Sequence, residues 1–164
     1  MKQWIDKQIH AKYTPYVLAF LIPFLVMAAV CAGHGIYPFG ENSFLHIDMY
    51  HQYAPFFMEF QRKLKAHESL MFSWNLGLGS DFVATFAYYL ASPVNWLVVF
   101  CSKQHLIEFM TVLVLLKIAC SGLFFAIYLG RHFKDNSYLV TLVSMFYALS
   151  AYISAYSWNI MWLD

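Results

Sequence analysis

An apolar run without a single charged residue, from Pro15 to Gly33, most constrains what this chain can fold into. A helix of this length spans the hydrocarbon core of a bilayer, which is roughly 30 Å thick. The composition agrees, because 61% of the residues are hydrophobic and 12% are charged, against roughly 25% charged in a soluble domain. The chain is therefore predicted to be a membrane protein.

Further apolar stretches predict an all-α polytopic fold with one membrane region over residues 1–164. Transmembrane helices are expected at about residues 16–32, 106–130 and 138–157. Residues 82–101 are also apolar, but Ser92, Pro93 and Asn95 interrupt them, so this segment either crosses the membrane or re-enters it. A long polar stretch, residues 34–81, separates the first apolar segment from residues 82–101, and we expect it to form a loop.

Basic residues set the expected topology, because short loops rich in lysine and arginine stay in the cytoplasm. They precede the first apolar run and follow the third, at Lys2, Lys7, Lys12, Arg131 and Lys134. If both sites are cytoplasmic, an even number of crossings separates them, which favours a re-entrant 82–101 segment. The N-terminus is then cytoplasmic and the 34–81 loop is extracytoplasmic. A cleaved signal peptide is the weaker interpretation, because the first apolar run is longer than a usual signal sequence.

The polar loop is predicted to hold short surface helices. Apolar residues recur at helical spacing from Ile47 to Lys65 and define an amphipathic helix on the membrane surface. They are Ile47, Tyr50, Tyr53, Ala54, Phe57, Phe60 and Leu64, while Glu59, Arg62 and Lys63 fall off this stripe. Gly77 and Gly79 then form a flexible joint into the second apolar segment.

Asp48 is the candidate catalytic residue. A carboxylate at the start of an interfacial helix is partly desolvated, so it could act as a base towards a ligand held by a lipid tail. The alternative is an ordinary helix cap or an acidic residue in the first helical turn. Gln52 and Tyr53, in the same segment, are candidate substrate-binding residues. Histidines nearby raise the possibility of a metal, but the spacing of His34, Glu41, His46, Asp48 and His51 matches no strong zinc pattern, and no metal ligands are assigned.

Lys117 is a second candidate, because a charge near the middle of an apolar segment is costly unless it is paired or faces a polar cavity. Snorkelling is the alternative. Aromatic and amide side chains could bind a sugar, whose ring offers an apolar face and a rim of hydroxyls. These are Trp74, Asn75, Trp158, Asn159 and Asp164, although tryptophans near an apolar helix also form interfacial belts.

Four ordered polar motifs resemble the N-terminal part of the YfhO family of bacterial membrane proteins, from about residue 13 onwards. They are "GIYPFGENSFLHIDMYHQYAPFF", "LMFSWNLGLGSDFVATFAYYLASPVNWL", "LLKIACSGLFFAIYL" and "FYALSAYISAYSWNIMWLD". The resemblance implies a GT-C type helical bundle with an amphipathic helix in its extracytoplasmic loop. Members of that family are several times longer, so the chain is expected to be an N-terminal piece that is inactive alone.

The resemblance also implies a reaction. GT-C glycosyltransferases take a sugar from a polyprenyl-phosphate donor on the outer membrane face, and an acidic residue of the first extracytoplasmic loop acts as base or orients the acceptor. Asp48 occupies that place here. Lys117, Arg62 or Lys63 would meet the charge of the leaving phosphate.

The expected acceptor is a wall polymer such as teichoic acid, and the expected sugar is N-acetylglucosamine. A flippase and a donor-making glycosyltransferase are the expected companions, and a divalent metal is left open as a cofactor.

Two other functions stay open: a component of a transporter or flippase, with Lys117 on its path, and a non-catalytic membrane scaffold. The net charge of +1 gives no reason to expect a nucleic-acid partner.

Overall fold

The structure is a computed structural model that describes residues 2–164, and side chains for residues 13–153 and 155–164. It contains two compact units, each described here by itself. The bundle unit comprises the first 33 residues and Leu115–Ala155, and the loop unit comprises His34–Val114 and Tyr156–Asp164.

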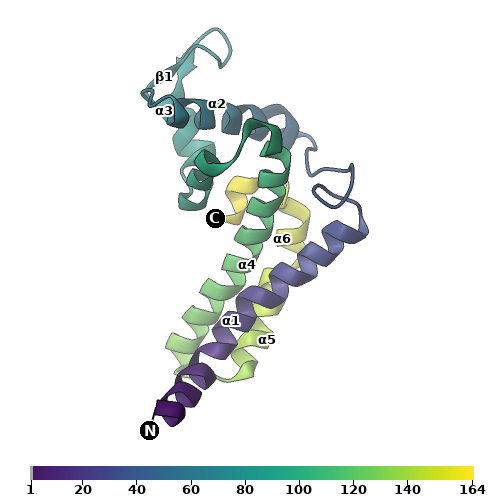
Figure 1. Ribbon diagram of the computed structural model, residues 1–164, viewed down its shortest axis with the longest axis vertical. Helices are drawn as coiled ribbons and strands as arrows, with labels where there is room; N and C mark the ends of the chain where they lie inside the picture. The colour runs from purple at the N-terminus through teal and green to yellow at the C-terminus, as the bar shows by residue number, and fades with distance from the viewer. Residues whose placement is uncertain (1) are drawn as a thin grey trace. The chain divides into compact units, whose positions relative to one another are not determined.

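Two long apolar helices dominate the chain, α1 (Lys2–Gly33) and α4 (Leu106–Phe133), as Figure 1 shows. Within them, Tyr13–Gly33 and Lys103–Phe133 are long and apolar enough to cross a membrane. In the part of the chain that the structure describes, the strands are limited to one short pair. The prediction of an all-α membrane protein is therefore confirmed.

The bundle unit is held by α1 packed along α5 (Tyr138–Ala148). Its core contains Ala19, Ala126 and Val140, flanked by Tyr16 and Leu129. Small residues on α1 and α4 allow the helices to approach closely, which is how helices associate in lipid. A buried hydrogen bond adds to this packing: Thr141 Oγ1 donates to the carbonyl oxygen of Pro15 over 2.9 Å.

A proline and a glycine determine how α1 meets α4. Pro23 has no backbone N–H, so the carbonyl oxygen of Ala19, four residues earlier, lacks its usual helical donor. That oxygen lies 2.5 Å from where a Cβ on Gly122 would stand. Because Gly122 has no side chain, α4 can bring its backbone against this carbonyl group.

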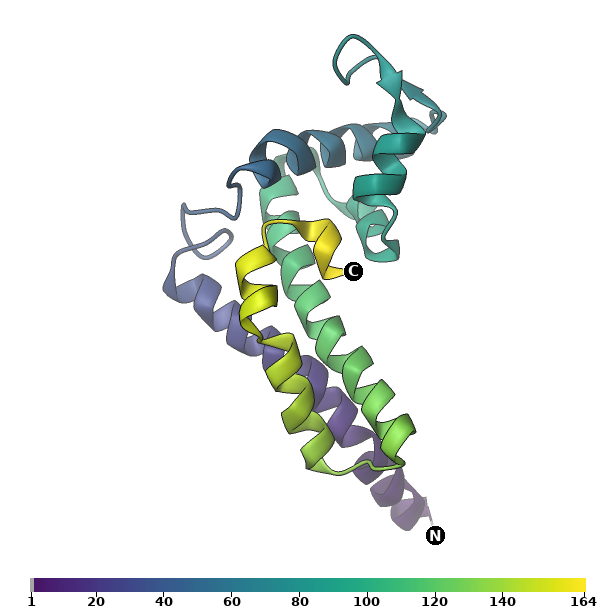
Figure 2. The same ribbon diagram turned by 180° about the vertical axis from the view of Figure 1, so that it is seen from behind.

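The fourth apolar segment differs from the single helix expected over residues 138–157. α5 ends at Ala148, and a separate helix, α6 (Ala151–Tyr156), follows (Figure 2). The break lies at Leu149, whose backbone (φ −103°, ψ 21°) has left the α-helical region, so the hydrogen-bond ladder stops there. The apolar helical stretch Tyr138–Ile153 is shorter than the two long candidate spans.

In the loop unit, the predicted surface helix exists, but its register differs. It begins with a π-helix, η1 (Met49–Tyr53), and continues as α2 (Ala54–Lys65). A π-turn holds more residues than an α-turn, so residues before it rotate around the helix axis. Met49 is therefore buried, while Ile47 and Tyr50, expected on the apolar face, are exposed.

The sequence predicts two short helices in this loop, but residues 66–81 contain no helix. Residues 72–81 instead form an antiparallel hairpin of β1 (Phe72–Ser73) and β2 (Ser80–Asp81). Gly79 makes this possible, because it has a φ of +102° and a Cβ there would lie 2.8 Å from the rings of both Phe72 and Trp74. Glycine is the residue that tolerates both conditions.

The 82–101 segment is sharply bent. It consists of α3 (Phe82–Thr85), the π-helix η2 (Phe86–Leu90) and the 3₁₀-helix η3 (Pro93–Phe100), with an angle of 107° at the break. Ser92 is extended (ψ 132°) because a residue before proline avoids the helical region. The side-chain amide of Gln61 holds η3 to α2 by donating to the carbonyl oxygens of Val98 (2.9 Å) and Cys101 (3.0 Å).

We predict that Gly122→Ala destabilises the bundle unit. The new methyl group would meet a backbone oxygen that cannot rotate away, and overpacking of this kind costs about 1–3 kcal/mol. Thermal unfolding of the detergent-solubilised protein measures the effect. Gly33→Ala is the matched control, since nothing lies within 4 Å of a Cβ there. Equal stability of the two variants would contradict this account.

Candidate active site

Asp48 lies at a strained point of the backbone. Ile47, directly before it, has a φ of +45°, a conformation that a β-branched residue rarely adopts. The π-helix η1 begins directly after it, at Met49. β-Branched residues in the left-handed backbone region and π-turns both cluster at functional sites. Each costs conformational free energy, so the surrounding packing must hold it in place.

The carboxylate of Asp48 does not cap the helix. It makes no side-chain hydrogen bond to the N-terminal amides of η1, which removes the capping interpretation. Instead, Oδ1 accepts a hydrogen bond from Gln52 Nε2 over 3.2 Å. Asp48 is partly exposed, so its carboxylate is oriented by Gln52 and still has acceptor positions available.

The C-terminal segment of the chain approaches this region. The ring of Tyr53, fully buried, packs edge-to-face on that of Tyr89 at 5.4 Å, and η5 (Ile160–Leu163) packs against η2. Burial raises the pKa of Tyr53 to about 12, partly offset by the backbone amide of Met161, while the nearby Tyr89 and Asp48 raise it further. The hydroxyl of Tyr53 is therefore protonated at neutral pH and can only serve as a neutral group.

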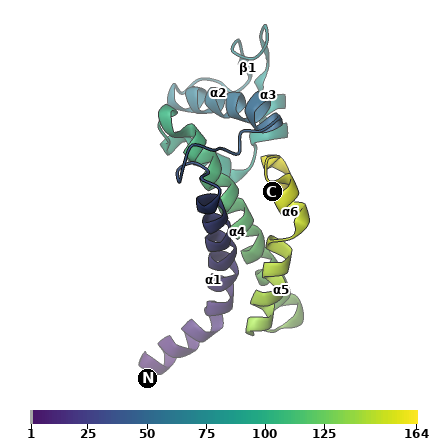
Figure 3. The same cartoon turned by 90° about the vertical axis from the view of Figure 1, so that its right-hand side faces the viewer.

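Three predicted binding residues belong to this same C-terminal segment. Asp164 Oδ1 accepts a hydrogen bond of 2.6 Å from the hydroxyl of Ser92, at the bend of the 82–101 segment. Asn159 is buried and Trp158 is half-buried. Asp48, Gln52 and Tyr53 thus share the loop unit with the end of the chain. Figure 3 shows that end, just beyond α6.

A second carboxylate, that of Glu59, is far more heavily bonded, although the sequence placed it on the polar side of the helix. Only 5% of its surface is exposed. Arg62 donates two hydrogen bonds to it (2.8 and 2.9 Å), Ser73 donates one (2.6 Å) and Asn75 donates one (2.9 Å). These bonds lower the pKa of Glu59 to about 2, with Arg62 the main cause.

The same network occupies both basic residues predicted to meet a phosphate. Arg62 also donates two hydrogen bonds to Glu68, over 2.5 and 2.7 Å. Lys63 is buried and donates to the carbonyl oxygens of Ser69 (2.9 Å) and Phe72 (2.8 Å). Internal acceptors therefore hold both cations, and their predicted contact with a phosphate stays a prediction.

Two further predicted residues of the loop unit, Trp74 and Asn75, belong to the hairpin. Asn75 belongs to the Glu59 network, about three helical turns beyond Asp48. Trp74 lies on the hairpin with 78% of its surface exposed. Lys117 is buried in α4 within the bundle unit, so its predicted role in substrate binding stays a prediction.

Two adjoining cavities follow one side of α2, and together they are called the α2 groove. One, of about 500 Å³, reaches Tyr50 and His51, in the first turn after Asp48. The other, of about 320 Å³, reaches Arg62 and Asn75. Both are lined by Pro55, Met58, Lys103 and Leu106.

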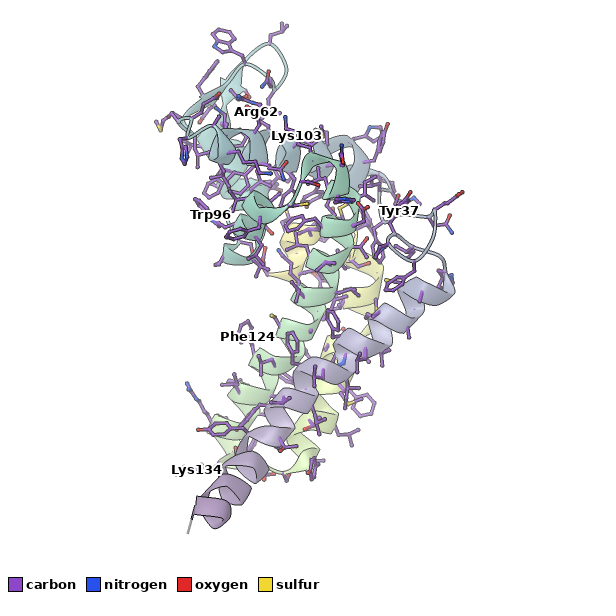
Figure 4. The ribbon with its side chains drawn as sticks, viewed as in Figure 1. Tyr37, Arg62, Trp96, Lys103, Phe124 and Lys134 are labelled. Atoms are coloured by element: carbon purple, nitrogen blue, oxygen red, sulfur yellow. The ribbon has the colours of Figure 1, made fainter. Side chains whose placement is uncertain are left out.

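Lys103 is the functional candidate that the sequence did not reveal. It lies in η4 (Lys103–His105), at the start of α4, as Figure 4 shows. α2 packs over this part of α4, with the rings of Phe57 and Phe109 6.1 Å apart. Among the described residues, Lys103 has no carboxylate within ion-pair distance. Its isolated position before an apolar run gave no sign that a groove would form around it.

The histidines and acids near Asp48 do not gather. In the described part of the chain, no three His, Cys, Asp or Glu side chains lie close enough together to hold a metal ion.

Residues 19–164 match the family described as bacterial membrane protein YfhO. The chain belongs to the YfhO family. No curated protein and no solved structure is significantly similar to it. The resemblance stated from the four polar motifs is thus confirmed, and the matched region contains the whole loop unit, Asp48 included.

Membership of the YfhO family places this chain among bacterial membrane proteins, in agreement with its apolar helices. The match also covers α4, α5 and most of the apolar part of α1, so the bundle unit and the loop unit both belong to the YfhO region.

We predict that Glu59→Gln lowers the free energy of unfolding by about 1–3 kcal/mol, because the hydrogen bonds from Ser73, Asn75 and Arg62 lose their charged, buried acceptor. Thermal unfolding in detergent measures this. Glu68→Gln is the control, because Glu68 binds the same Arg62 from an exposed position and should matter much less. A larger loss in the Glu68 variant would contradict the assigned roles.

The pH dependence follows from the same carboxylate. The pKa of Glu59 is lowered from 4.5 to about 2, so its contribution to stability is complete above about 4.5 and is lost as the pH falls towards 2. The wild-type protein should therefore lose more stability than Glu59→Gln between pH 5 and pH 2. Parallel stability curves for the two proteins would show that another group dominates acid unfolding.

Proposed function

We propose that this chain forms part of the active centre of a membrane glycosyltransferase, with Asp48 as the residue that activates the acceptor hydroxyl. Membership of the YfhO family supports this class of function. The observation that carries the proposal is the state of Asp48: its carboxylate is oriented by Gln52, follows a strained residue and caps no helix.

The contrast with Glu59 explains why Asp48 is the better candidate. Glu59 accepts four hydrogen bonds and is buried beside two cations, so it is held as a carboxylate with little acceptor capacity left. A general base needs a free lone pair and access to the substrate. Asp48 meets both conditions, since it is partly exposed and accepts one side-chain hydrogen bond from the described residues.

The proposed reaction transfers a sugar from a polyprenyl-phosphate donor to a hydroxyl group. The acceptor oxygen forms a bond to the anomeric carbon of the sugar, and the bond from that carbon to the phosphate oxygen breaks. The acceptor proton passes to Asp48, and polyprenyl phosphate leaves with the bonding electron pair. No oxidant or reductant is required.

Charge builds up on the leaving phosphate, and Lys103 is the residue we assign to it. Lys103 lines both cavities of the α2 groove and has no carboxylate within ion-pair distance among the described residues. A fixed cation beside this phosphate binds the negatively charged donor and also stabilises the charge that develops as the phosphate leaves. Lys117, buried in α4, is kept as a second candidate for this charge.

The setting that we propose is the bacterial cell membrane, with the N-terminus in the cytoplasm and the loop unit at the outer face. The proposed sugar is N-acetylglucosamine and the proposed acceptor is a wall polymer such as teichoic acid. A flippase and a separate enzyme that makes the lipid-linked sugar would supply the donor to that face, and a divalent metal is a possible further component.

We predict that Asp48→Asn abolishes sugar transfer. The amide keeps the shape and the contact with Gln52, but it cannot accept a proton, and loss of a general base lowers rates by roughly 10²–10⁴-fold. The substitution is introduced into the gene in its host, and the sugar content of the wall polymer is compared with that of the wild type and of a deletion strain.

Glu41→Gln is the matched control, since Glu41 is an exposed carboxylate of the same loop. Immunoblots of the membrane fraction establish equal protein amounts. Wild-type sugar content with Asp48→Asn would refute the assigned role of Asp48.

We predict that Lys103→Ala raises the KM for the lipid-linked donor by roughly 10–100-fold, the value of one hydrogen bond to a charged group. Lys103→Arg, which retains the charge, should recover most of the affinity. Transfer by isolated membranes is measured over a range of donor concentrations. An unchanged donor KM in Lys103→Ala would exclude the assigned contact.

A further inference from the structure

The bundle unit contains a groove that the proposed reaction does not use. It has a volume of about 840 Å³ and runs between α1 and α4. Its walls are apolar side chains of the two helices: Val17, Phe20, Leu21, Leu123 and Ile127. Val17 and Leu21 are exposed, so the groove opens on the apolar outer surface of the helices.

One end of this groove is polar. Tyr13, Arg131 and Asn136 line it there, beside Tyr16 and Gly130. Gly130 has no side chain, and the hydroxyl of Tyr16 occupies the space where a Cβ would stand. The Tyr16 hydroxyl donates to Asn136 Oδ1. This leaves the NH₂ group of Asn136 as a donor at the mouth of the groove.

The charge at this mouth is positive. Among the residues whose side chains the structure describes, Arg131 has no carboxylate within ion-pair distance. Asp135, the nearest acid along the chain, is engaged with the backbone N–H (2.9 Å) and the hydroxyl (2.7 Å) of Ser137. α5 begins at Tyr138, so its positive N-terminal end adds to the field. Lys134 lies in the same turn, as Figure 4 shows.

We propose that this groove binds one anionic phospholipid, with an acyl chain along α1 and α4 and the phosphate group at Arg131. From Tyr13 to Leu21 the groove extends about 12 Å along the helix axis, enough for much of one acyl chain. A guanidinium group and an amide donor match the charge and the acceptors of a phosphate diester. The inference concerns the bundle unit alone and does not depend on the proposed glycosyltransferase activity.

The test compares phosphatidylglycerol with phosphatidylcholine of identical acyl chains, added to the detergent-solubilised protein and followed by native mass spectrometry. We expect phosphatidylglycerol to bind at least tenfold more tightly. Arg131→Gln should abolish this preference, because it removes the cation and keeps the size. Lys134→Gln is the matched control: it removes a neighbouring cation that does not line the groove, and the preference should persist.

A second variant tests the apolar part of the site. Val17→Trp would fill the groove from a position that is 52% exposed, so folding should not suffer, and it should abolish binding of both lipids. Equal affinity of the wild type for the two lipids would overturn the proposal. So would an equal loss in Lys134→Gln, or unchanged binding in Val17→Trp. A wild-type dimer that Val17→Trp dissociates would assign the groove to a second copy of the chain instead.

Discussion

The loop unit depends on the ion pair between the buried Glu59 and the partly exposed Arg62. Without it, the hairpin and α2 would share few polar contacts, because Ser73 and Asn75 both reach α2 through the carboxylate of Glu59. Such a pair is expensive to desolvate and is stable only when its remaining hydrogen-bonding positions are filled. Here four donors fill those of Glu59, and Glu68 completes those of Arg62. The network thus fixes one end of the helix whose other end presents Asp48.

The long helices could be predicted from the sequence because the signal for them lies within each segment and does not depend on tertiary contacts. An uncharged apolar run of membrane length predicts a helix whatever surrounds it, and α1 and α4 followed that expectation. The 82–101 segment was also recognisable as irregular, since Pro93 forces the residue before it out of the helical region. Local chemistry decided each of these features.

The details of the loop unit depend on contacts that a sequence pattern does not encode. Glu59 and Lys63 belong to the polar part of a helical pattern, yet both are buried, because the hairpin folds over them and supplies their hydrogen-bonding partners. Lys103 was missed for the same reason, since its importance comes from the groove around it. Asp48 was found through its place in the loop and through family resemblance. The structure added that it does not cap the helix.

The π-turn at Met49–Tyr53 has a further meaning for Asp48. Compared with a regular α-helix, the π-turn inserts one extra residue between that carboxylate and the core residues Phe57 and Phe60. One residue corresponds to about 100° of rotation around an α-helix. The direction in which Asp48 faces is therefore set by the number of residues between it and the core, and a deletion of one residue there would turn the carboxylate to another side of the helix.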